Sequence, residues 1–258
     1  MFLMKIKVVI VFLFFCCHFF TYASVTTLDA SNQQIEYFSD AKKKLLMIHA
    51  SDPILLRTFY CQAQFDADTK KLTLPDGFDD TLYHQRSQQL EFEHIVPAEN
   101  FGRAFVEWRE GHPNCVDSKN KSYKGRRCAT KMNRNYRFMQ ADLYNLYPAI
   151  GSVNAARKNY NFLPLGQSVA SSFGLCVFKI DDRKVEPADY VKGFIARTYL
   201  YMHETYEQFK MSKSQYRLMQ AWNNQYAITE QECVRYQLIK KIQGSENNIL
   251  KKLCFKSK

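Results

Sequence analysis

The sequence lacks the features that would divide it into domains or hold it in a membrane. No Pro/Ser/Gly-rich linker, internal repeat or low-complexity tract occurs in its 258 residues, which include only 9 glycines and 7 prolines. Beyond residue 20 there is no further long apolar run, so no later membrane segment is expected. Cys-x-x-Cys does not occur either, and this argues against a structural zinc site. These absences favour one soluble domain.

The N-terminal residues have the pattern of a secretory signal. Lys5 and Lys7 precede an uncharged stretch at 8–20, and Ala23 and Ser24 supply small residues for cleavage. We therefore predict a signal peptide over 1–23 and a single mature domain over 24–258, found in the periplasm or the medium. An uncleaved anchor is the alternative, but the stretch is shorter than the roughly 20 apolar residues of a membrane span.

Cysteine use agrees with export. Removing residues 1–23 takes away Cys16 and Cys17 and leaves an even number, which in an exported chain argues for disulfide bonds. Cys115 and Cys128 are the obvious local pair, closing a loop rich in lysine and arginine. The cysteines that remain are Cys61, Cys115, Cys128, Cys176, Cys233 and Cys254.

Positive charge is concentrated in one part of the chain. The net charge is +11, and it becomes +9 without Lys5 and Lys7. Such a cluster attracts polyanions and releases counterions when it binds a phosphate backbone. A solvated basic loop, or one that contacts anionic lipid, is the alternative. The interval 119–137 contains no acid, has Tyr123 and Tyr136 interleaved, and carries Lys119, Lys121, Lys124, Arg126, Arg127, Lys131, Arg134 and Arg137.

The apolar pattern predicts a mixed α+β fold that is mainly helical. Part of 25–60 has helical periodicity, whereas 61–92 alternates loosely and predicts short strands, one leading into Glu93. The stretch 97–135 looks irregular, and 133–146 looks helical. The C-terminal third predicts helices over 196–209, after Ser214 and after Thr229. Ser212 and Thr229 begin capping-box patterns, and the aromatic stripes that follow are expected in the core.

Glu93 and His94 are the strongest candidates for chemistry. A neutral imidazole with a pKa near ~6.5 can take a proton from water at neutral pH. Mg²⁺ prefers oxygen ligands and often uses only one or two protein groups, so the Glu93 carboxylate and the amide oxygen of Asn145 suit it. Adjacent residues on a strand point to opposite faces, so the chain must leave the strand near His94 if both are to serve one site. Taken alone, this pair could also be an ordinary buried histidine beside a surface acid.

These motifs resemble the endonuclease I family of secreted and periplasmic nucleases, which includes the Vibrio extracellular DNases. The resemblance covers nearly the whole mature chain, and its motifs occur in the family's order. The matching segments are Glu91-Phe92-Glu93-His94-Ile95-Val96-Pro97-Ala98, Asp142-Leu143-Tyr144-Asn145-Leu146, Gly151-Ser152-Val153-Asn154-Ala155-Ala156-Arg157-Lys158-Asn159, 195–202, Ala221-Trp222-Asn223 and Glu232-Cys233.

The resemblance implies a ββα-metal (His-Me) finger and nonspecific cleavage of double- and single-stranded DNA, and often of RNA, to 5′-phosphate products. By motif, His94 is the general base, and Glu93 and Asn145 hold one Mg²⁺. Asn154, Arg157 and Asn159 match recurrent positions of the family, and we interpret them as residues that support the metal ligands or contact the substrate. We expect a monomer without stable membrane association after signal cleavage.

Two departures from the family are visible. The family's Tyr-Cys-Gly-Cys run is Tyr60-Cys61-Gln62-Ala63 here, so one disulfide is missing. The resemblance then implies the pairs Cys61–Cys254, Cys115–Cys128 and Cys176–Cys233. Relatives also have a phosphate-binding arginine after a Gly-Gly pair; the matching region is 108–115, and no arginine stands at the matching place within it. The candidates for this role are Arg109, Arg126, Arg127 and Arg157.

The sequence therefore predicts a secreted, Mg²⁺-dependent, sequence-nonspecific endonuclease. The alternative is an extracellular nucleic-acid-binding protein without catalysis, for which the basic loop alone would suffice. A contact toxin would use the same chemistry as the nuclease and differ only in its biology.

Overall fold

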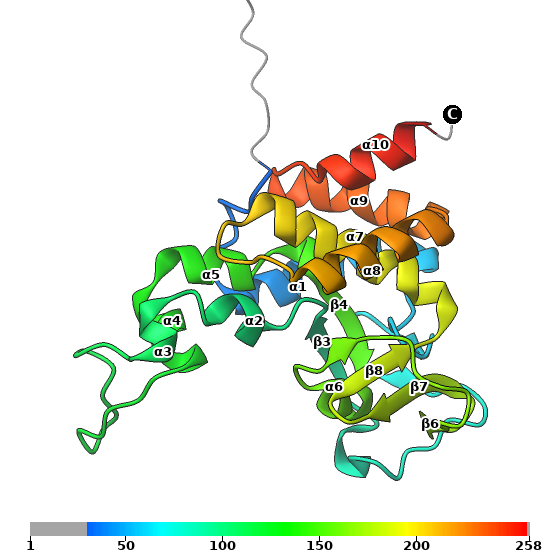
Figure 1. Cartoon of the computed structure of the whole chain (residues 1–258), viewed down its shortest axis with the longest axis horizontal. Coiled ribbons are helices and arrows are strands. Elements are labelled where there is room, and N and C mark those ends of the chain that lie inside the picture. Colours follow the sequence, from blue (N-terminus) through cyan, green and yellow to red (C-terminus); the bar gives the residue numbers. More distant parts are fainter. Residues whose placement is uncertain (1–29, 257–258) are drawn as a thin grey trace, which may run out of the picture.

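The computed structural model describes residues 30–256, so the predicted signal peptide lies outside the described residues. Helices from the C-terminal third form one layer, at the top of Figure 1, with α1 behind them. α7 packs on α8 and α10, and α9 packs on α10 and α1. No helix in 30–256 has the length and apolar character needed to cross a membrane. The helices of this layer are α1 (Phe38–Ala50), α7 (Asp189–Thr205), α8 (Lys213–Gln225), α9 (Glu230–Gln243) and α10 (Asn248–Lys256).

A small mixed sheet lies on the other side of the molecule, at the lower right of Figure 1. Its strand order is β5-β8-β7-β6, with β5 parallel to β8 and the other pairs antiparallel. A separate hairpin pairs β1 (Gln64–Phe65) with β2 (Leu72–Thr73). The strands of the sheet are β5 (Asn161–Phe162), β6 (Ser171–Phe173), β7 (Cys176–Asp181) and β8 (Lys184–Pro187).

The two-stranded sheet β3–β4 lies between these parts and positions the candidate site. β3 (Leu90–His94) is antiparallel to β4 (Leu146–Ile150), with Leu90 opposite Ile150 and His94 opposite Leu146. Helix α6 (Gly151–Arg157) follows β4 without a loop and contacts both strands. This pairing brings residues that are more than fifty positions apart in sequence to the same place.

Short helices occupy much of the segment between β3 and β4. The stretch 97–135 was expected to be irregular, and this is wrong for about half of it because its backbone groups are satisfied by single helical turns. The segment between α3 and α4 is irregular, as expected, and extends from the body at the lower left of Figure 1. The helices are α2 (Ala98–Gly102), α3 (Val106–Arg109), α4 (Arg126–Met132) and α5 (Arg134–Gln140).

The helix predicted over 133–146 ends early, at Gln140. The carboxylate of Asp142 accepts a hydrogen bond from the backbone N–H of Tyr144 and caps the 3₁₀ turn η3 (Leu143–Asn145), which leads directly into β4. A short apolar run fits a buried strand as well as a helix. Pairing with β3 decided between them, and every residue of β4 is buried.

The helical prediction for the C-terminal third is confirmed. Thr229 and Glu232 form both bonds of a capping box at the start of α9, and the Ser212 hydroxyl accepts from the backbone of Gln215 at the start of α8. The helix predicted over 196–209 ends at Thr205, although Tyr206 and Phe209 are buried as expected.

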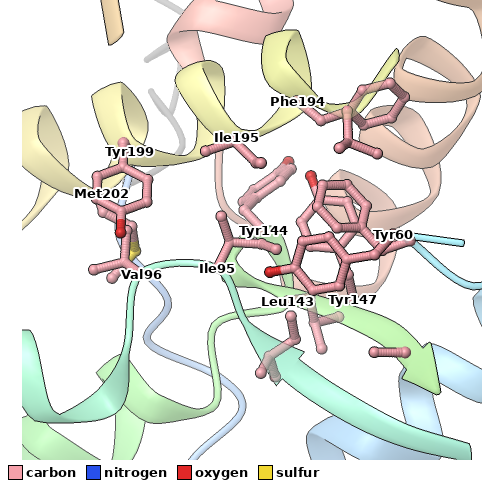
Figure 2. Close-up of a cluster of buried hydrophobic side chains, with 14 of the residues drawn as sticks. Tyr60, Ile95, Val96, Leu143, Tyr144, Tyr147, Phe194, Ile195, Tyr199 and Met202 are labelled. Carbon is pink, nitrogen blue, oxygen red and sulfur yellow. The ribbon is translucent and has the colours of Figure 1, made fainter. Parts of the chain in front are cut away.

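The core packs α7 onto the β3–β4 region. Figure 2 shows Ile195 and Met202 of α7 facing Ile95 and Val96, with the rings of Tyr60, Tyr144 and Tyr147 beside them. Ile95 and Val96 immediately follow the candidate catalytic pair and are fully buried. The apolar packing therefore anchors the end of β3 from behind.

A buried carboxylate joins three parts of this core. Asp142 Oδ2 accepts from the hydroxyls of Tyr201 at 2.7 Å and Tyr206 at 2.6 Å, and Oδ1 accepts from Gln243 at 2.9 Å. Burial raises the pKa of Asp142 above its ordinary value, while these donors act in the opposite direction. Asp142 therefore connects the turn before β4 to α7 and α9.

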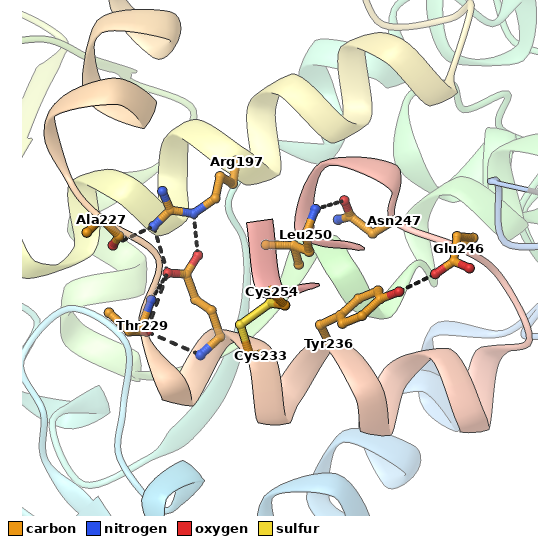
Figure 3. The surroundings of a disulfide bond; sticks show 10 residues. Arg197, Ala227, Thr229, Cys233, Tyr236, Glu246, Asn247, Leu250 and Cys254 are labelled. Atoms are coloured by element: carbon orange, nitrogen blue, oxygen red, sulfur yellow. Dashed lines mark hydrogen bonds and ion pairs between the residues drawn. A yellow bond between two sulfur atoms is a disulfide. The ribbon is translucent and has the colours of Figure 1, made fainter. Parts of the chain in front are cut away.

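The disulfide pairing corrects the sequence-based expectation at two of three bonds. Cys115–Cys128 is confirmed, but Cys61 pairs with Cys176 and Cys233 pairs with Cys254. The predicted pairs Cys61–Cys254 and Cys176–Cys233 are wrong because α10 folds back along α9 (Figure 3), so Cys254 lies within 5.6 Å of Cys233 between Cα atoms. The start of β7 carries Cys176 to Cys61, with Cα atoms 5.2 Å apart.

Candidate active site

One open cavity of about 410 Å³ contains the predicted catalytic pair. Its walls come from the end of β3, from α2 and from α6 with the turn that follows, and Trp108 and Arg126 complete them. Several elements that are distant in sequence therefore meet at one place. The lining residues are Phe92, Glu93, His94, Pro97, Ala98, Glu99, Trp108, Arg126, Asn154, Arg157, Lys158 and Asn159.

Glu93 and His94 both line this cavity although they are consecutive strand residues. His94 is the last residue of β3, the chain bends at Ile95 and Val96, and α2 begins at Ala98. The chain therefore leaves the strand at this point, as the sequence argument required.

Glu93 is a buried carboxylate, with a side chain 5% exposed. Its Oε1 accepts a hydrogen bond of 3.0 Å from the Tyr60 hydroxyl and lies 3.3 Å from Nε of Arg157. Burial raises the pKa of Glu93 to about 7, and Arg157 and then the Tyr60 hydrogen bond act in the opposite direction. Within residues 30–256 no hydrogen bond engages Oε2, so this oxygen can serve a ligand.

His94 is held as a neutral imidazole of one tautomer. Its Nε2 lies 2.8 Å from the carbonyl oxygen of Gln140, and because a carbonyl only accepts, we assign the proton to Nε2 and the lone pair to Nδ1. The ring stacks on Phe38 at 5.0 Å between centroids. Burial, and then the positive charge of Arg126, lower the pKa of His94 to about 3. The side chain is therefore uncharged at neutral pH, as a general base must be.

Asn145 lies outside this cavity and is fully buried. Its Oδ1 accepts from the backbone N–H of Val96 at 2.7 Å, and its Nδ2 donates to the Val96 carbonyl at 3.0 Å. The amide thus joins Val96, two residues after the end of β3, to the turn before β4. This placement argues against the metal-ligand role predicted for Asn145.

Asn154 and Asn159 do line the cavity. Nδ2 of Asn154 donates to Glu91 at 2.7 Å, and Nδ2 of Asn159 donates to Glu99 at 2.7 Å. A carboxylate only accepts, so each nitrogen faces the carboxylate and each amide oxygen is left for another partner. Within residues 30–256 the amide oxygen of Asn154, on α6, has no hydrogen-bond partner, whereas that of Asn145 is bonded to Val96.

Of the four candidate arginines, Arg126 combines exposure with a place at the cavity. It begins α4 directly after Gly125, whose φ of 75° lets the chain turn into the helix. Its guanidinium lies 5.1 Å from the centroid of the Phe38 ring. The sequence argument looked for an arginine near Cys115, whereas the structure brings Arg126, two residues before Cys128, to the cavity.

The other three arginines have different surroundings. Arg157 is only 1% exposed, and its guanidinium donates to the carbonyls of His94 and Ile95, so it supports the turn after β3 rather than a phosphate. Arg109 and Arg127 do not line the cavity. Arg109 bonds to the Arg103 carbonyl at 2.8 Å, and Arg127 lies over the Tyr123 ring at 4.1 Å.

Lys158 was not predicted, yet it is exposed and lines the cavity. It ends α6 with a φ of 52°, a backbone conformation that residues other than glycine seldom adopt. A hydrogen bond from its ammonium to Tyr160 raises the pKa of Lys158, and Tyr83 adds to this effect. Its position inside the Arg157–Asn159 motif was the available signal.

The donor chemistry fits a hard cation with few protein ligands. Glu93 Oε2 and the Asn154 amide oxygen are the kinds of atoms that Mg²⁺ prefers, and water and phosphate usually complete its shell. Nowhere in 30–256 do three His, Cys, Asp or Glu side chains gather as a metal site. A metal here would therefore depend on substrate for part of its coordination.

A buried carboxylate, a neutral imidazole and exposed cations around one cavity define a hydrolytic site for an anionic substrate. Comparison with known proteins specifies the family. The sequence profile of the family Endonuclease I matches residues 18–253, and the chain therefore belongs to this family.

Named relatives agree over most of their length. Endonuclease-1 of Buchnera aphidicola subsp. Baizongia pistaciae is 34% identical, covering 93% of this chain and 95% of the relative. An extracellular deoxyribonuclease of Aeromonas hydrophila is 33% identical, covering 90% and 95%. A periplasmic deoxyribonuclease of the same organism is 34% identical, covering 86% and 88%.

Proposed function

We propose that this chain is an exported, sequence-nonspecific endonuclease that hydrolyses phosphodiester bonds of DNA, and of RNA as well, to 5′-phosphate products. The observation that carries this proposal is the neutral, tautomer-fixed His94 beside Glu93 and Arg126 in one cavity. Family membership and the names of the relatives support DNA as the substrate. We further propose that β3, β4 and α6 are the ββα-metal finger.

His94 is the general base of the proposed reaction. Its Nδ1 takes a proton from the attacking water, and the imidazolium that forms is stabilised because Nε2–H already donates to the Gln140 carbonyl. The stack on Phe38 keeps the ring plane fixed during this transfer. A preoriented base removes the cost of arranging it in the transition state.

Glu93 and Asn154 would hold one Mg²⁺, with Asn154 in the role that sequence reasoning gave to Asn145. When bound, Mg²⁺ stabilises charge on the phosphate and on the leaving 3′ oxygen. Tyr60 and Arg157 engage Oε1 of Glu93 and thereby turn Oε2 toward the ligand. Arg126 and Lys158, the exposed cations at the cavity, bind phosphate oxygens.

Export is the second part of the proposal. All six cysteines outside 1–23 are paired in disulfides, which persist in the periplasm and outside the cell. The extracellular and periplasmic relatives point the same way. A monomer remains our expectation.

Plasmid nicking tests the proposal directly. Oxidised wild type should nick supercoiled DNA with Mg²⁺ and not with EDTA, and His94→Ala should be slower by about 10²- to 10⁴-fold. His84→Ala is the matched control, because His84 is an exposed histidine of the turn η2 (His84–Arg86). Religation by DNA ligase without kinase treatment would identify 5′-phosphate ends.

A non-catalytic nucleic-acid-binding protein is the alternative that this experiment separates. Such a protein would retard DNA on a gel and never cut it with any of several divalent metals. Wild-type cleavage rates in His94→Ala would instead reject the general-base role while leaving the nuclease in place.

A further inference from the structure

Asn154 can act as a metal ligand only if its amide is held in one of its two orientations. An asparagine amide has one oxygen and one NH₂ group of nearly equal size, and only the oxygen binds a cation. Rotation by half a turn would present the NH₂ group to the cavity. Something must therefore fix the amide, and the structure contains a suitable contact.

That contact is the carboxylate of Glu91. Its Oε2 accepts from Asn154 Nδ2 at 2.7 Å, and Arg86 Nε donates to its Oε1 at 2.8 Å. A second ion-pair contact joins the Arg86 guanidinium to Oε2. Because the Glu91 carboxylate oxygens accept hydrogen bonds from Asn154 and Arg86, the carboxylate selects the orientation with nitrogen toward Glu91 and oxygen toward the cavity.

A glycine leaves room for the carboxylate of Glu91. A Cβ added at Gly151, the first residue of α6, would lie 2.7 Å from Glu91 Oε1 and 2.7 Å from the Arg86 carbonyl oxygen. Glycine therefore allows the carboxylate to approach the start of the helix that carries Asn154. Glu91 itself lies on β3 two residues before Glu93, so one strand supplies both a cavity carboxylate and the support for Asn154.

We propose that Glu91, held by Arg86, is a positioning residue that orients the Asn154 amide toward the metal. The inference rests on the metal site of the proposed function. Outer groups that orient a ligand in this way commonly change metal affinity by about 10- to 100-fold when they are lost. Glu91 does not touch the metal, and its effect passes entirely through Asn154.

A change that keeps the charge and shortens the reach tests this mechanism. Glu91→Asp retains a carboxylate for Arg86 but withdraws it by one methylene from Asn154. We expect it to weaken binding of Mn²⁺ alone, measured by electron paramagnetic resonance or calorimetry, about tenfold. If the carboxylate acted only through its charge, this variant would bind Mn²⁺ as wild type does, and that result would overturn the proposal.

The matched control is Glu99→Asp. Glu99 also pairs with an arginine, Arg103, and accepts from a cavity asparagine, Asn159, but Asn159 is not assigned as a metal ligand. Its Mn²⁺ affinity should stay within about twofold of wild type. An equal loss in both variants would point to the general electric field of the cavity and would reject the specific role of Glu91.

A double-mutant cycle completes the test. In an Asn154→Ala background, Glu91→Asp should cause no further loss of Mn²⁺ affinity, because the residue through which it acts is gone. Additive losses would contradict the proposal. Failure of wild type to bind Mn²⁺ would overturn the metal site of the proposed function and this inference with it. Binding by wild type that Glu91→Asp leaves unchanged would overturn this inference alone.

Discussion

At the scale of single residues, two asparagines nine positions apart have opposite surroundings. Both polar atoms of the Asn145 amide are hydrogen-bonded to the backbone of Val96. The Asn154 amide lines the cavity, and in the described part of the chain only its nitrogen has a hydrogen-bond partner. Both residue type and neighbourhood in sequence made Asn145 a reasonable candidate. What separates them is which polar groups each meets after folding.

Alanine substitution should separate the two asparagines. Asn145→Ala leaves a buried N–H and C=O of Val96 without partners, and we expect it to lower the free energy of unfolding by about 2 to 4 kcal/mol. Asn154→Ala should lose cleavage and Mn²⁺ binding and change stability by less than about 1 kcal/mol. Urea unfolding and plasmid nicking of both variants check this. Comparable losses of stability would show that Asn154 is structural as well.

His49 gives a prediction about pH. It is fully buried, Nδ1 bonds to the Leu55 carbonyl, and burial lowers the pKa of His49 to about 4. The unfolded chain takes up this proton below about pH 6.5 and the folded chain does not, so stability is lost as the pH falls from about 6.5 to 4. The loss at pH 4 should be on the order of 3 kcal/mol.

The difference between wild type and His49→Gln isolates this effect. Glutamine can still donate to Leu55 but does not titrate, so the variant should lose less stability over the same pH range. Subtraction is needed because burial raises the pKa values of Glu93 and Asp142, which act in the opposite sense. If the free energies of unfolding of the two proteins changed in parallel from pH 7 to 4, the lowered pKa of His49 would not be the cause of the loss.

At the scale of elements, two disulfides close loops of comparable length beside different structures. Cys115–Cys128, with a sequence separation of 13, closes the projecting segment at the start of α4, where Arg126 lies two residues before Cys128. Cys233–Cys254, with a separation of 21, joins α9 to α10 in the helical layer beside the Arg197–Glu232 ion pair (Figure 3). The first adjoins the cavity, and the second does not.

Replacing each pair by serine should therefore have unequal effects on activity. Chain entropy predicts a loss of roughly 3 kcal/mol in stability for either pair. Only Cys115→Ser/Cys128→Ser should also slow DNA cleavage under conditions where both proteins are folded, because the start of α4 positions Arg126. Unfolding curves together with cleavage rates below the melting transition measure this. Equal rates of DNA cleavage in the two variants would contradict a role for the Cys115–Cys128 loop in positioning Arg126.

At the scale of the whole molecule, the basic interval 119–137 is not one uniform surface. Arg134 and Arg137 pair with Glu36, so part of its charge is already neutralised. Lys119, Lys121 and Lys124 have no acidic partner in the described part of the chain. These three lysines lie on the segment between α3 and α4, which extends away from the body in Figure 1.

This distribution predicts the salt dependence of DNA binding. In a His94→Ala background, we change Lys119, Lys121 and Lys124 to alanine. The log of the DNA-binding constant should then fall less steeply with log salt concentration, the slope being smaller in magnitude by up to about 3. Lys184, the first residue of β8 with a side chain 42% exposed, gives the control Lys184→Ala, which should leave the slope unchanged. Fluorescence anisotropy at several salt concentrations measures it. An unchanged slope in the triple variant would show that these lysines do not contact DNA phosphates.

The sequence by itself determined the local features of this protein. Glu93 and His94 at the end of a strand, the capped helices of the C-terminal third and the Cys115–Cys128 bond depend on residues close together in the chain. The remaining disulfides, and the positions of Asn145, Asn154 and Arg126 relative to the cavity, were decided only by tertiary structure. Each depends on contacts across tens of residues, above all the β3–β4 pairing, and local periodicity carries no information about such contacts.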